Sequence, residues 1–423
     1  MGQYSRIKLD NGLVVITEKN ASLETASLQI YLNTGSIYET DEEAGILHFI
    51  EHMIFKGTPT RTREQISSEM DFLGGRFNAY TSKEEICVYG NFMKQDLQRT
   101  ADVLFDVILN PIFPKVEFET EKGVILEEIM MGEDDPSKKV WYEFDDNIWR
   151  ESSFGRRIIG TSENIKKFTR DDLSKIYDRF LNPLNLIIIC TGNFDDTWLE
   201  YEIEKRFGKL ENKEFNVFRP KLQKPTYHYK KVFVEKDIEQ IQFILGTERK
   251  YDPKEFDFDY KAMISVLGSG WSSKLFERIR EELGYVYGIW ATTVDVQNSS
   301  IALIGGSTSK DKIVNAIKEI KGVLSNTIAG KVDDDDLAKA KQILKSNLLF
   351  SLESPSNRGG RLHAEYMRYS RNYPIERTLE QIDAVSKDQI LESVKNVFGD
   401  EKLAITFVGK DGSVPETEWD EKR

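Results

Sequence analysis

The chain has 423 residues, of which 39% are hydrophobic and 30% charged, and its formal net charge is −13. This length predicts two or more domains, and the hydrophobic content is sufficient for packed cores, which excludes a disordered protein. The acidic balance and the lack of a basic run argue against a nucleic acid as the main partner.

The cysteines and the N-terminal segment bear on the compartment. Cys87 and Cys190 lie far apart, without the spacing of a metal site or a disulfide framework, so we expect a reducing, cytoplasmic environment. Residues 1–6 contain no apolar signal region. No apolar run is long enough to cross a bilayer, so we expect no membrane partner.

A β-meander opens the chain, with strands predicted at residues 4–9, 13–17 and 27–32. The segment that follows predicts a helix. Thr40–Glu43 has the pattern of a capping box, so we expect this helix to begin near Asp41. The helix is apolar nearly all the way round, which is typical of a buried helix.

Two of the four histidines fall on this helix, with a glutamate between them. His48, Glu51 and His52 stand at i, i+3 and i+4 and therefore share one stripe. Burying three ionisable groups together is costly unless something satisfies them all. A pair of hydrogen-bonded core histidines is one interpretation. The spacing favours a metal site, and the order matches the inverted motif His-x-x-Glu-His.

A pair of glutamates on one helix face follows further along the chain. We expect a helix at residues 63–73, two strands within residues 76–92, a helix at 95–109 and another from about residue 116. The last of these carries Glu121 and Glu128, which are seven apart and so on one face, whereas Glu127 points elsewhere.

The simplest interpretation of these glutamates is a solvated acidic face. Val124, Ile125 and Leu126 are apolar, however, and we expect them to bury much of this turn. A zinc ion with two histidine ligands also lacks a third protein ligand, and two histidines with one glutamate form a known catalytic set.

The second half of the chain repeats the first. Residues 212–231 have little periodicity and contain two prolines, so we interpret them as a linker between an N-terminal domain, residues 1–211, and a C-terminal domain, residues 232–423. We expect an α+β fold of two duplicated domains, each a mostly antiparallel β-sheet packed with helices. The matching segments are residues 163–169 with 380–386, 186–192 with 403–409, and 83–108 with 298–320.

The second copy lacks the histidine motif. A glycine-rich segment, residues 267–275, stands in its place, and it fits neither the P-loop nor the dinucleotide fingerprint. The arginines and tyrosines that follow, at residues 278–287, lie where a helix gives way to a strand, and by themselves they are typical of surface and packing residues.

Four stretches together resemble a known family: His48–Thr58, Phe77–Glu84, Val124–Ile129 and Ser272–Phe276. They are similar to the pitrilysin-type zinc metallopeptidases, or inverzincins, and closest to the branch of the mitochondrial processing peptidase β-subunit and its stand-alone bacterial relatives. The resemblance spans both halves of the chain. It implies a zinc-dependent endopeptidase that cleaves peptides or unfolded segments.

The resemblance also implies roles for the motif residues. His48, His52 and Glu128 would bind one zinc ion per chain, and Glu51 would be the general base that activates water. Glu121 would support the site from behind the ligands.

The resemblance implies that two further sets of residues contact the substrate, one on a strand and one in the C-terminal domain. The strand residues Asn78, Ala79, Tyr80 and Thr81 would form an exposed edge on which the substrate adds as another strand.

In the family an arginine and a tyrosine seven apart in the C-terminal domain contact the substrate near the scissile bond. Both Arg280–Tyr287 and Arg278–Tyr285 fit that spacing. Placing Gly284 on the family's glycine favours Arg280 and Tyr287.

The family encloses its substrate in a clam-shell chamber of four homologous domains, of which this chain supplies two. The resemblance therefore implies a homodimer in which the zinc domain of one chain faces the Arg–Tyr domain of the other. Two other functions belong to relatives: a catalytically silent scaffold or chaperone-like subunit, and a presequence-processing peptidase that needs a partner subunit. The intact His-x-x-Glu-His motif argues against the silent subunit.

Overall fold

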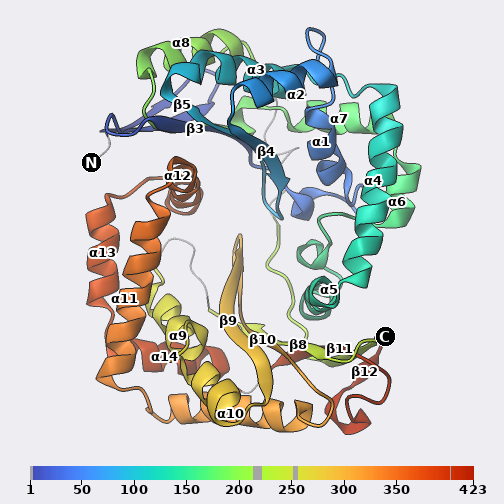
Figure 1. Cartoon of the computed structure of the whole chain (residues 1–423), viewed down its shortest axis with the longest axis vertical. Coiled ribbons are helices and arrows are strands. Elements are labelled where there is room, and N and C mark those ends of the chain that lie inside the picture. The colour runs from blue at the N-terminus through green and yellow to red at the C-terminus, as the bar shows by residue number, and fades with distance from the viewer. Residues whose placement is uncertain (1–2, 213–221, 251–255, 401) are drawn as a thin grey trace. The chain divides into compact units, whose positions relative to one another are not determined.

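The computed structural model describes residues 3–212, 222–250, 256–400 and 402–423 (Figure 1). Its internal contacts divide the chain into two compact units. The first contains residues 1–130, 156–223 and 351–372, and the second contains residues 131–155, 224–350 and 373–423. The first unit thus takes a helix from late in the chain, α12 (Pro355–Tyr369), and the second takes an early one, α5 (Pro136–Ile148).

Residues 213–221, in the first half of the predicted linker, residues 212–231, lie outside the described residues. The predicted domain limits on either side of it stay a prediction.

The first unit is built on a six-stranded sheet in the order β1-β2-β6-β3-β5-β4. Neighbouring strands are antiparallel except β2 and β6, which are parallel. Among the described strands β4 pairs only with β5, so it lies at an edge of the sheet. The strands are β1 (Gln3–Lys8), β2 (Val14–Lys19), β3 (Thr25–Leu32), β4 (Arg76–Thr81), β5 (Ile86–Met93) and β6 (Leu186–Gly192).

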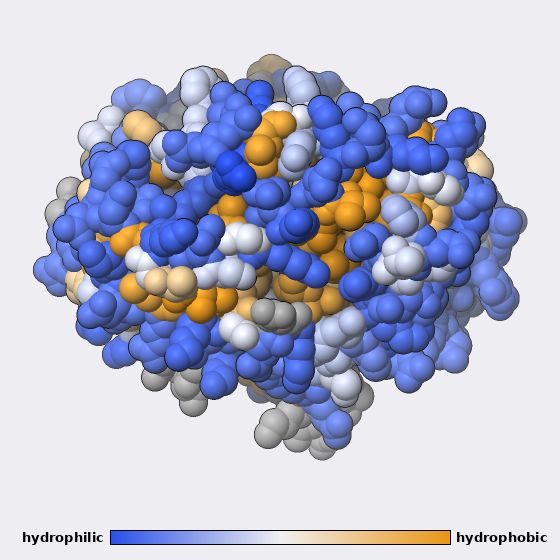
Figure 2. All heavy atoms as spheres, turned by 90° about the horizontal axis from the view of Figure 1, so that it is seen from below, coloured by the Kyte–Doolittle hydropathy of each residue, from blue (hydrophilic) through white to orange (hydrophobic). Residues whose placement is uncertain are grey.

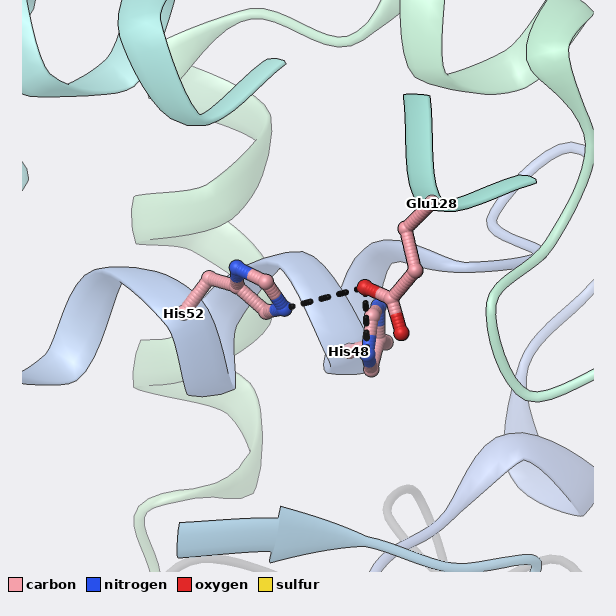
Figure 3. A group of neighbouring side chains, drawn as sticks. All are labelled: His48, His52 and Glu128. Atoms are coloured by element: carbon pink, nitrogen blue, oxygen red, sulfur yellow. Dashed lines mark ion pairs between the residues drawn. The ribbon is translucent and has the colours of Figure 1, made fainter. Parts of the chain in front are cut away.

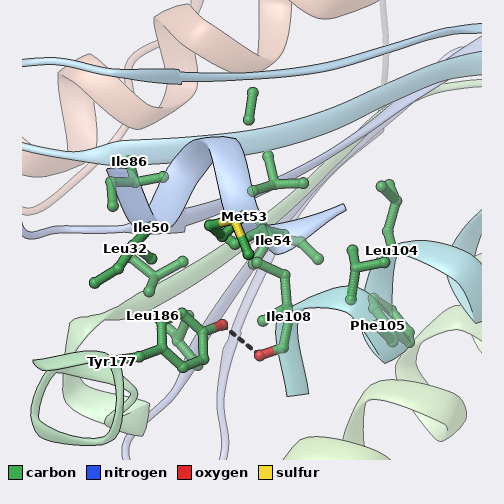
Figure 4. Packing of buried hydrophobic residues seen from close by; sticks show 14 of the residues in the cluster. Leu32, Ile50, Met53, Ile54, Ile86, Leu104, Phe105, Ile108, Tyr177 and Leu186 are labelled. Atoms are coloured by element: carbon green, nitrogen blue, oxygen red, sulfur yellow. Dashed lines mark hydrogen bonds between the residues drawn. The ribbon is translucent and has the colours of Figure 1, made fainter. Parts of the chain in front are cut away.

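Helices cover both faces of this sheet. On one face, Ile50 and Met53 of α1 lie in the same buried cluster as Leu104 and Ile108 of α3 (Figure 4). Burying each such side chain contributes roughly 1.5–3 kcal/mol to folding. On the other face Leu362 of α12 packs in a smaller buried cluster with residues of β2, β3, β5 and β6. The other helices of this part are α1 (Ile46–Ile54), α2 (Arg63–Phe72), α3 (Leu97–Leu109), α4 (Lys115–Asp134), α6 (Ser162–Lys167), α7 (Arg170–Phe180) and α8 (Asp196–Phe207).

The second unit also has a six-stranded sheet, in the order β12-β7-β11-β8-β10-β9. Five of its strands repeat the order of the first sheet, whereas β12 comes last in the chain and is parallel to β7, unlike β1, which is antiparallel to β2. The pair β7 and β11 is parallel, as β2 and β6 are, and β9 takes the edge position that β4 has in the first sheet. Its elements are β7 (Lys231–Glu235), β8 (Ile241–Glu248), α9 (Phe258–Gly268), the π-helical η6 (Phe276–Glu282), β9 (Val286–Val296), β10 (Ser299–Thr308), α10 (Ile313–Ile328), α11 (Asp334–Ser351), α13 (Ile375–Ala384), α14 (Lys387–Phe398), β11 (Ala404–Gly409) and β12 (Glu421–Lys422).

The predicted duplication is confirmed by the order of the five strands that the two sheets share. The helices α7 and α14 each begin with a capping box, formed by Thr169 with Asp172 and by Ser386 with Gln389. Each helix then leads to the central parallel strand of its sheet, β6 or β11. The sequence repeat therefore corresponds to a repeat of topology.

The predicted start of α1 near Asp41 is wrong. Thr40 and Glu43 do exchange the two hydrogen bonds of a capping box, but these close only a turn. Gly45 has a φ of 96°, in the left-handed region, so the helix begins after it, at Ile46.

On the face shown in Figure 2 most residues are hydrophilic, with apolar residues visible between them. Within the described residues no helix combines the length and the apolar character needed to span a membrane.

Candidate metal centre

Helix α1 presents three ionisable side chains along one stripe. His48, Glu51 and His52 occupy it, while the apolar residues on the rest of the helix are buried. The side chains of the three are 12%, 16% and 20% exposed, in that order. Groups this buried need polar partners or a ligand to offset their lost hydration.

Helix α4 supplies the partners. Glu121 and Glu128 both reach the stripe, as their spacing of seven predicts, and Glu127 is exposed. The expectation that Val124 helps to bury this turn is wrong, because it is 46% exposed, whereas Ile125 is fully buried. Ile125 and the partly buried Leu126 therefore pack against the core, and Val124 lies on the outer side of the turn.

His48, His52 and Glu128 form the one group of three possible metal ligands found among the described residues (Figure 3). One ligand atom from each lies within 4.8 Å of the others. The Glu128 Oε2 atom is 4.0 Å from His48 Nε2 and 3.7 Å from His52 Nε2. A tetrahedral zinc ion holds its ligands at about 2.0–2.1 Å, hence roughly 3.3 Å from one another. Both Glu128 distances are somewhat longer than that spacing, and the Glu128 side chain is 41% exposed.

A contact with a residue outside the ligand group orients the ring of His52. Its Nδ1 lies 3.0 Å from Glu121 Oε2, and the other oxygen of Glu121 accepts a hydrogen bond from Lys56 Nζ at 2.6 Å. Burial acts to raise the pKa of Glu121, but the hydrogen bonds from Lys56 and His52 outweigh it and hold that pKa below its usual value. An ionised Glu121 fixes the Nδ1–H tautomer of His52 and leaves Nε2 to bind a metal.

His48 is held neutral by its surroundings. Burial, with a smaller contribution from His52, lowers the pKa of His48 to about 3. A neutral imidazole is the form that binds a metal. The Nδ1 atom of His48 is buried and makes no hydrogen bond within the described structure. The two histidines are thus supported differently.

Glu51 lies beside the three ligands without belonging to their group. Its Oε2 atom is 4.0 Å from His48 Nε2. Burial raises the pKa of Glu51, and the nearby Glu128 adds to that effect. A carboxylate with a raised pKa is a better proton acceptor near neutral pH, as a general base requires.

The predicted substrate strand lies next to this helix. Asn78, Ala79, Tyr80 and Thr81 all belong to the edge strand β4, against which α1 packs. Ala79 is buried in the core on the α1 side, and Tyr80 is 41% exposed. The outer backbone groups of β4 have no strand partner among the described strands.

The two predicted Arg–Tyr pairs differ in their contacts within the second unit. Arg280 lies with its guanidinium carbon 5.8 Å from the ring centre of Tyr287, which is 79% exposed. Arg278 instead forms ion pairs with Glu319 and Glu282, and Tyr285 packs partly buried against the core. Only the first pair combines mutual contact with an exposed tyrosine.

Two residues near the site escape the sequence analysis. Lys56 lies just beyond the end of α1 and donates to Glu121, which is 65 positions further along the chain, so no local spacing in the sequence indicates this contact. Glu39 accepts hydrogen bonds from the backbone at the start of α1. No spacing in the sequence indicates that contact, because Thr40 and Glu43 already have the pattern of the cap.

The chain has a duplicated α+β fold, an inverted histidine motif and a glutamate from a second helix. These features define a class of proteins, the metallopeptidases of the inverted-motif type. Comparison with known families agrees. The family described as "Insulinase (Peptidase family M16)" matches residues 14–162, and the "Peptidase M16 inactive domain" matches residues 167–344. The chain belongs to peptidase family M16.

Relatives of similar length exist in bacteria. A protein of Rickettsia felis named "Uncharacterized zinc protease" is 32% identical over 392 residues, which cover 92% of this chain and 94% of that protein. The Bacillus subtilis protein named "Uncharacterized zinc protease YmxG" is 28% identical over 410 residues, 97% of this chain and 99% of its own.

Solved structures share the fold. A protease from Helicobacter pylori superposes with a TM-score of 0.88 at 20% identity, covering 96% of this chain and 100% of the other. A Pseudomonas fluorescens structure titled as a peptidase M16 inactive domain superposes with a TM-score of 0.87 at 16% identity, covering 98% and 99%. The predicted fold class, two sheet-and-helix halves, is confirmed.

Proposed function

We propose that this protein is a zinc-dependent endopeptidase that cleaves peptides or unfolded polypeptide segments. The observation that carries the proposal is the convergence of His48, His52 and Glu128, with Glu51 beside them. The names of the Rickettsia felis and Bacillus subtilis relatives support the same activity.

The residues present fit one zinc ion per chain. His48 is neutral, the Nε2 atom of His52 is directed by the Glu121 contact, and Glu128 supplies an anionic oxygen. Together they would form a His₂Glu set, which is a ligand set used by catalytic zinc sites. When bound, zinc supplies Lewis acidity, which polarises the scissile carbonyl and makes a water molecule easier to deprotonate.

Glu51 moves the proton in this proposal. Its carboxylate accepts a proton from the attacking water and then delivers it to the nitrogen of the departing amine. The amine leaves as a neutral group, the new carboxyl group forms on the other fragment, and Glu51 returns to its ionised state.

The substrate binds as an added strand. The outer edge of β4, residues Asn78 to Thr81, offers backbone donors and acceptors to an extended peptide beside α1. Such binding requires an unfolded segment and gives affinity with little sequence preference. Tyr287, next to Arg280 and exposed, is the candidate donor to the oxyanion of the transition state.

The proposed assembly is a homodimer that encloses the substrate. One chain holds both a unit with the metal ligands and a unit with the Arg280–Tyr287 pair, and a chamber of four such units needs two chains. In this arrangement each zinc centre is completed by the Arg–Tyr unit of the partner.

The test uses the purified chain alone. Zinc is measured by elemental analysis, and cleavage of a quenched-fluorescence peptide library is followed with and without chelator. We expect about one zinc per chain, loss of cleavage with chelator and its return on adding zinc. A zinc-loaded chain that cleaves nothing favours the silent scaffold. Cleavage that appears only with a second protein favours the presequence-processing peptidase.

A further inference from the structure

The first turn of α1 is capped from outside the helix. Gly45 at the N-cap position has no side chain to accept the exposed amide hydrogens. Glu39 accepts them instead: its Oε2 lies 3.0 Å from the Gly45 nitrogen and its Oε1 lies 2.9 Å from the Leu47 nitrogen. Leu47 directly precedes His48.

Glu39 is buried, unlike the side chains that cap α2, α7 and α8. Glu39 as a whole is only 5% exposed. Burial raises the pKa of Glu39 to about 8, even though the two backbone hydrogen bonds oppose that rise. By contrast, the caps of α2, α7 and α8 are made by Thr62, Thr169 and Asp195 in exposed contacts. An exposed cap would stabilise α1 about as well at a lower desolvation cost, so helix stability alone does not explain a buried one.

The surroundings of Glu39 are themselves fixed. Arg156 donates to the backbone oxygens of Ser36 and Glu39 and pairs with Asp41. A Cβ atom on Gly160 would lie 2.3 Å from the Ala44 oxygen, so the segment before the helix is clamped against its neighbour. The Glu39 carboxyl group is therefore held at the start of α1 by a loop that is itself fixed by hydrogen bonds and close packing.

We infer that Glu39 is a positioning residue for the proposed metal centre, because it fixes the first turn of α1 and thereby places His48. The two histidines need different supports. His52 is oriented through its ring by Glu121, whereas the Nδ1 of His48 makes no hydrogen bond in the described structure. The position of the His48 ring consequently depends on the backbone of the turn that Glu39 holds.

This inference rests on the proposed zinc site, and its test measures zinc affinity besides activity. The variant Glu39→Gln keeps the volume but replaces one acceptor oxygen by an amide group. Asp195→Ala is the matched control: it removes a cap of the same unit, which accepts from the Trp198 nitrogen at 3.0 Å, on a helix without ligands. The dissociation constant for zinc is measured by competition with a chromophoric chelator, well below the unfolding temperature of each variant.

We expect Glu39→Gln to bind zinc about 10-fold more weakly or worse, and its cobalt-substituted form to show an altered visible spectrum. Asp195→Ala should lose stability while zinc affinity and cobalt spectrum stay as in the wild type. Glu39→Asp, which keeps the charge but not the reach, replaces Glu39→Gln if that variant does not fold, and should shift both readouts in the same direction. Wild-type affinity and spectrum in the folded Glu39 variant would overturn the inference alone. A wild-type chain that binds no zinc would overturn the proposed function and the inference with it.

Discussion

His52 and Glu121 are joined by a contact of 3.0 Å between Nδ1 and Oε2, formed between a ring on α1 and a carboxylate on α4. The same carboxylate holds Lys56 through its other oxygen. Glu121 therefore links the two helices that carry all three candidate ligands. It also sets which nitrogen of His52 is available to a metal.

Replacing Glu121 by Gln should weaken zinc binding by about 10–100-fold. The amide keeps the shape but is a weaker acceptor for the His52 ring, and it leaves Lys56 without its charged partner. Competition with a chelator measures the affinity. Glu127→Gln on the exposed side of the same helix is the control and should change nothing. Equal affinities for the two variants would contradict the role given to Glu121.

The variant Glu51→Gln separates binding from proton transfer. Glu51 lies outside the ligand group, so zinc content should stay at the wild-type level. Because an amide cannot accept the proton of the attacking water, kcat should fall by about 10²–10⁴-fold. Elemental analysis and a peptide cleavage assay on the same sample test both halves. Appreciable turnover by a zinc-loaded Glu51→Gln chain would remove Glu51 from the mechanism.

Tyr287 and Tyr285 provide a comparison within one strand region. Tyr287→Phe removes the hydroxyl of an exposed tyrosine next to Arg280 and should lower kcat by about 10²–10³-fold with little change in stability. Tyr285→Phe alters a partly buried packing residue and should leave kcat close to that of the wild type. The reverse ranking in steady-state kinetics would assign the role to Arg278 and Tyr285.

The parts of the site that the sequence predicts depend on local geometry. The stripe of His48, Glu51 and His52 follows from helical periodicity, and the shared face of Glu121 and Glu128 follows from their spacing of seven. Both are found in the structure. These relations need only the helix, whose geometry is the same wherever it lies.

The parts that escaped prediction depend on tertiary contacts. Gly45 has a left-handed φ, so α1 does not extend back to Asp41 as predicted. A glycine permits this backbone conformation but does not require it. Glu39 reaches the helix only through the loop held by Arg156. The placement of α5 and α12 with opposite units is likewise a property of packing between distant segments.

Mixing two inactive variants tests the proposed homodimer. Glu51→Gln removes the proposed general base from the unit with the metal ligands, and Tyr287→Phe removes the hydroxyl group from the unit with the Arg–Tyr pair. Each variant leaves the other unit of its chain intact. If each centre is completed by the partner chain, mixed dimers contain one intact centre, and activity should partly return on mixing and subunit exchange. Light scattering should give the mass of a dimer. No recovery in mixed dimers, or full activity from a monomer, would show that the pairing does not cross between chains.

The buried His48 should make the metal-free protein sensitive to mild acid. Its pKa is about 3 in the folded chain, chiefly because of burial, against 6.5 for an exposed histidine. The unfolded chain therefore binds a proton that the folded chain excludes, and the free energy of unfolding should fall as the pH drops from about 6.5 toward about 3. The slope for one such proton approaches about 1.4 kcal/mol per pH unit.

The measurement is urea unfolding in the presence of chelator, at several pH values below neutrality, for the wild type and for His48→Gln. The variant has no titrating ring at this position, so its stability should decline less over the same range. The glutamine also packs differently from the histidine, which changes the free energy of unfolding at every pH. The comparison therefore uses the slope of that free energy against pH and not its absolute value. Identical slopes for the two proteins would mean that His48 takes up its proton as readily in the folded chain as in the unfolded one.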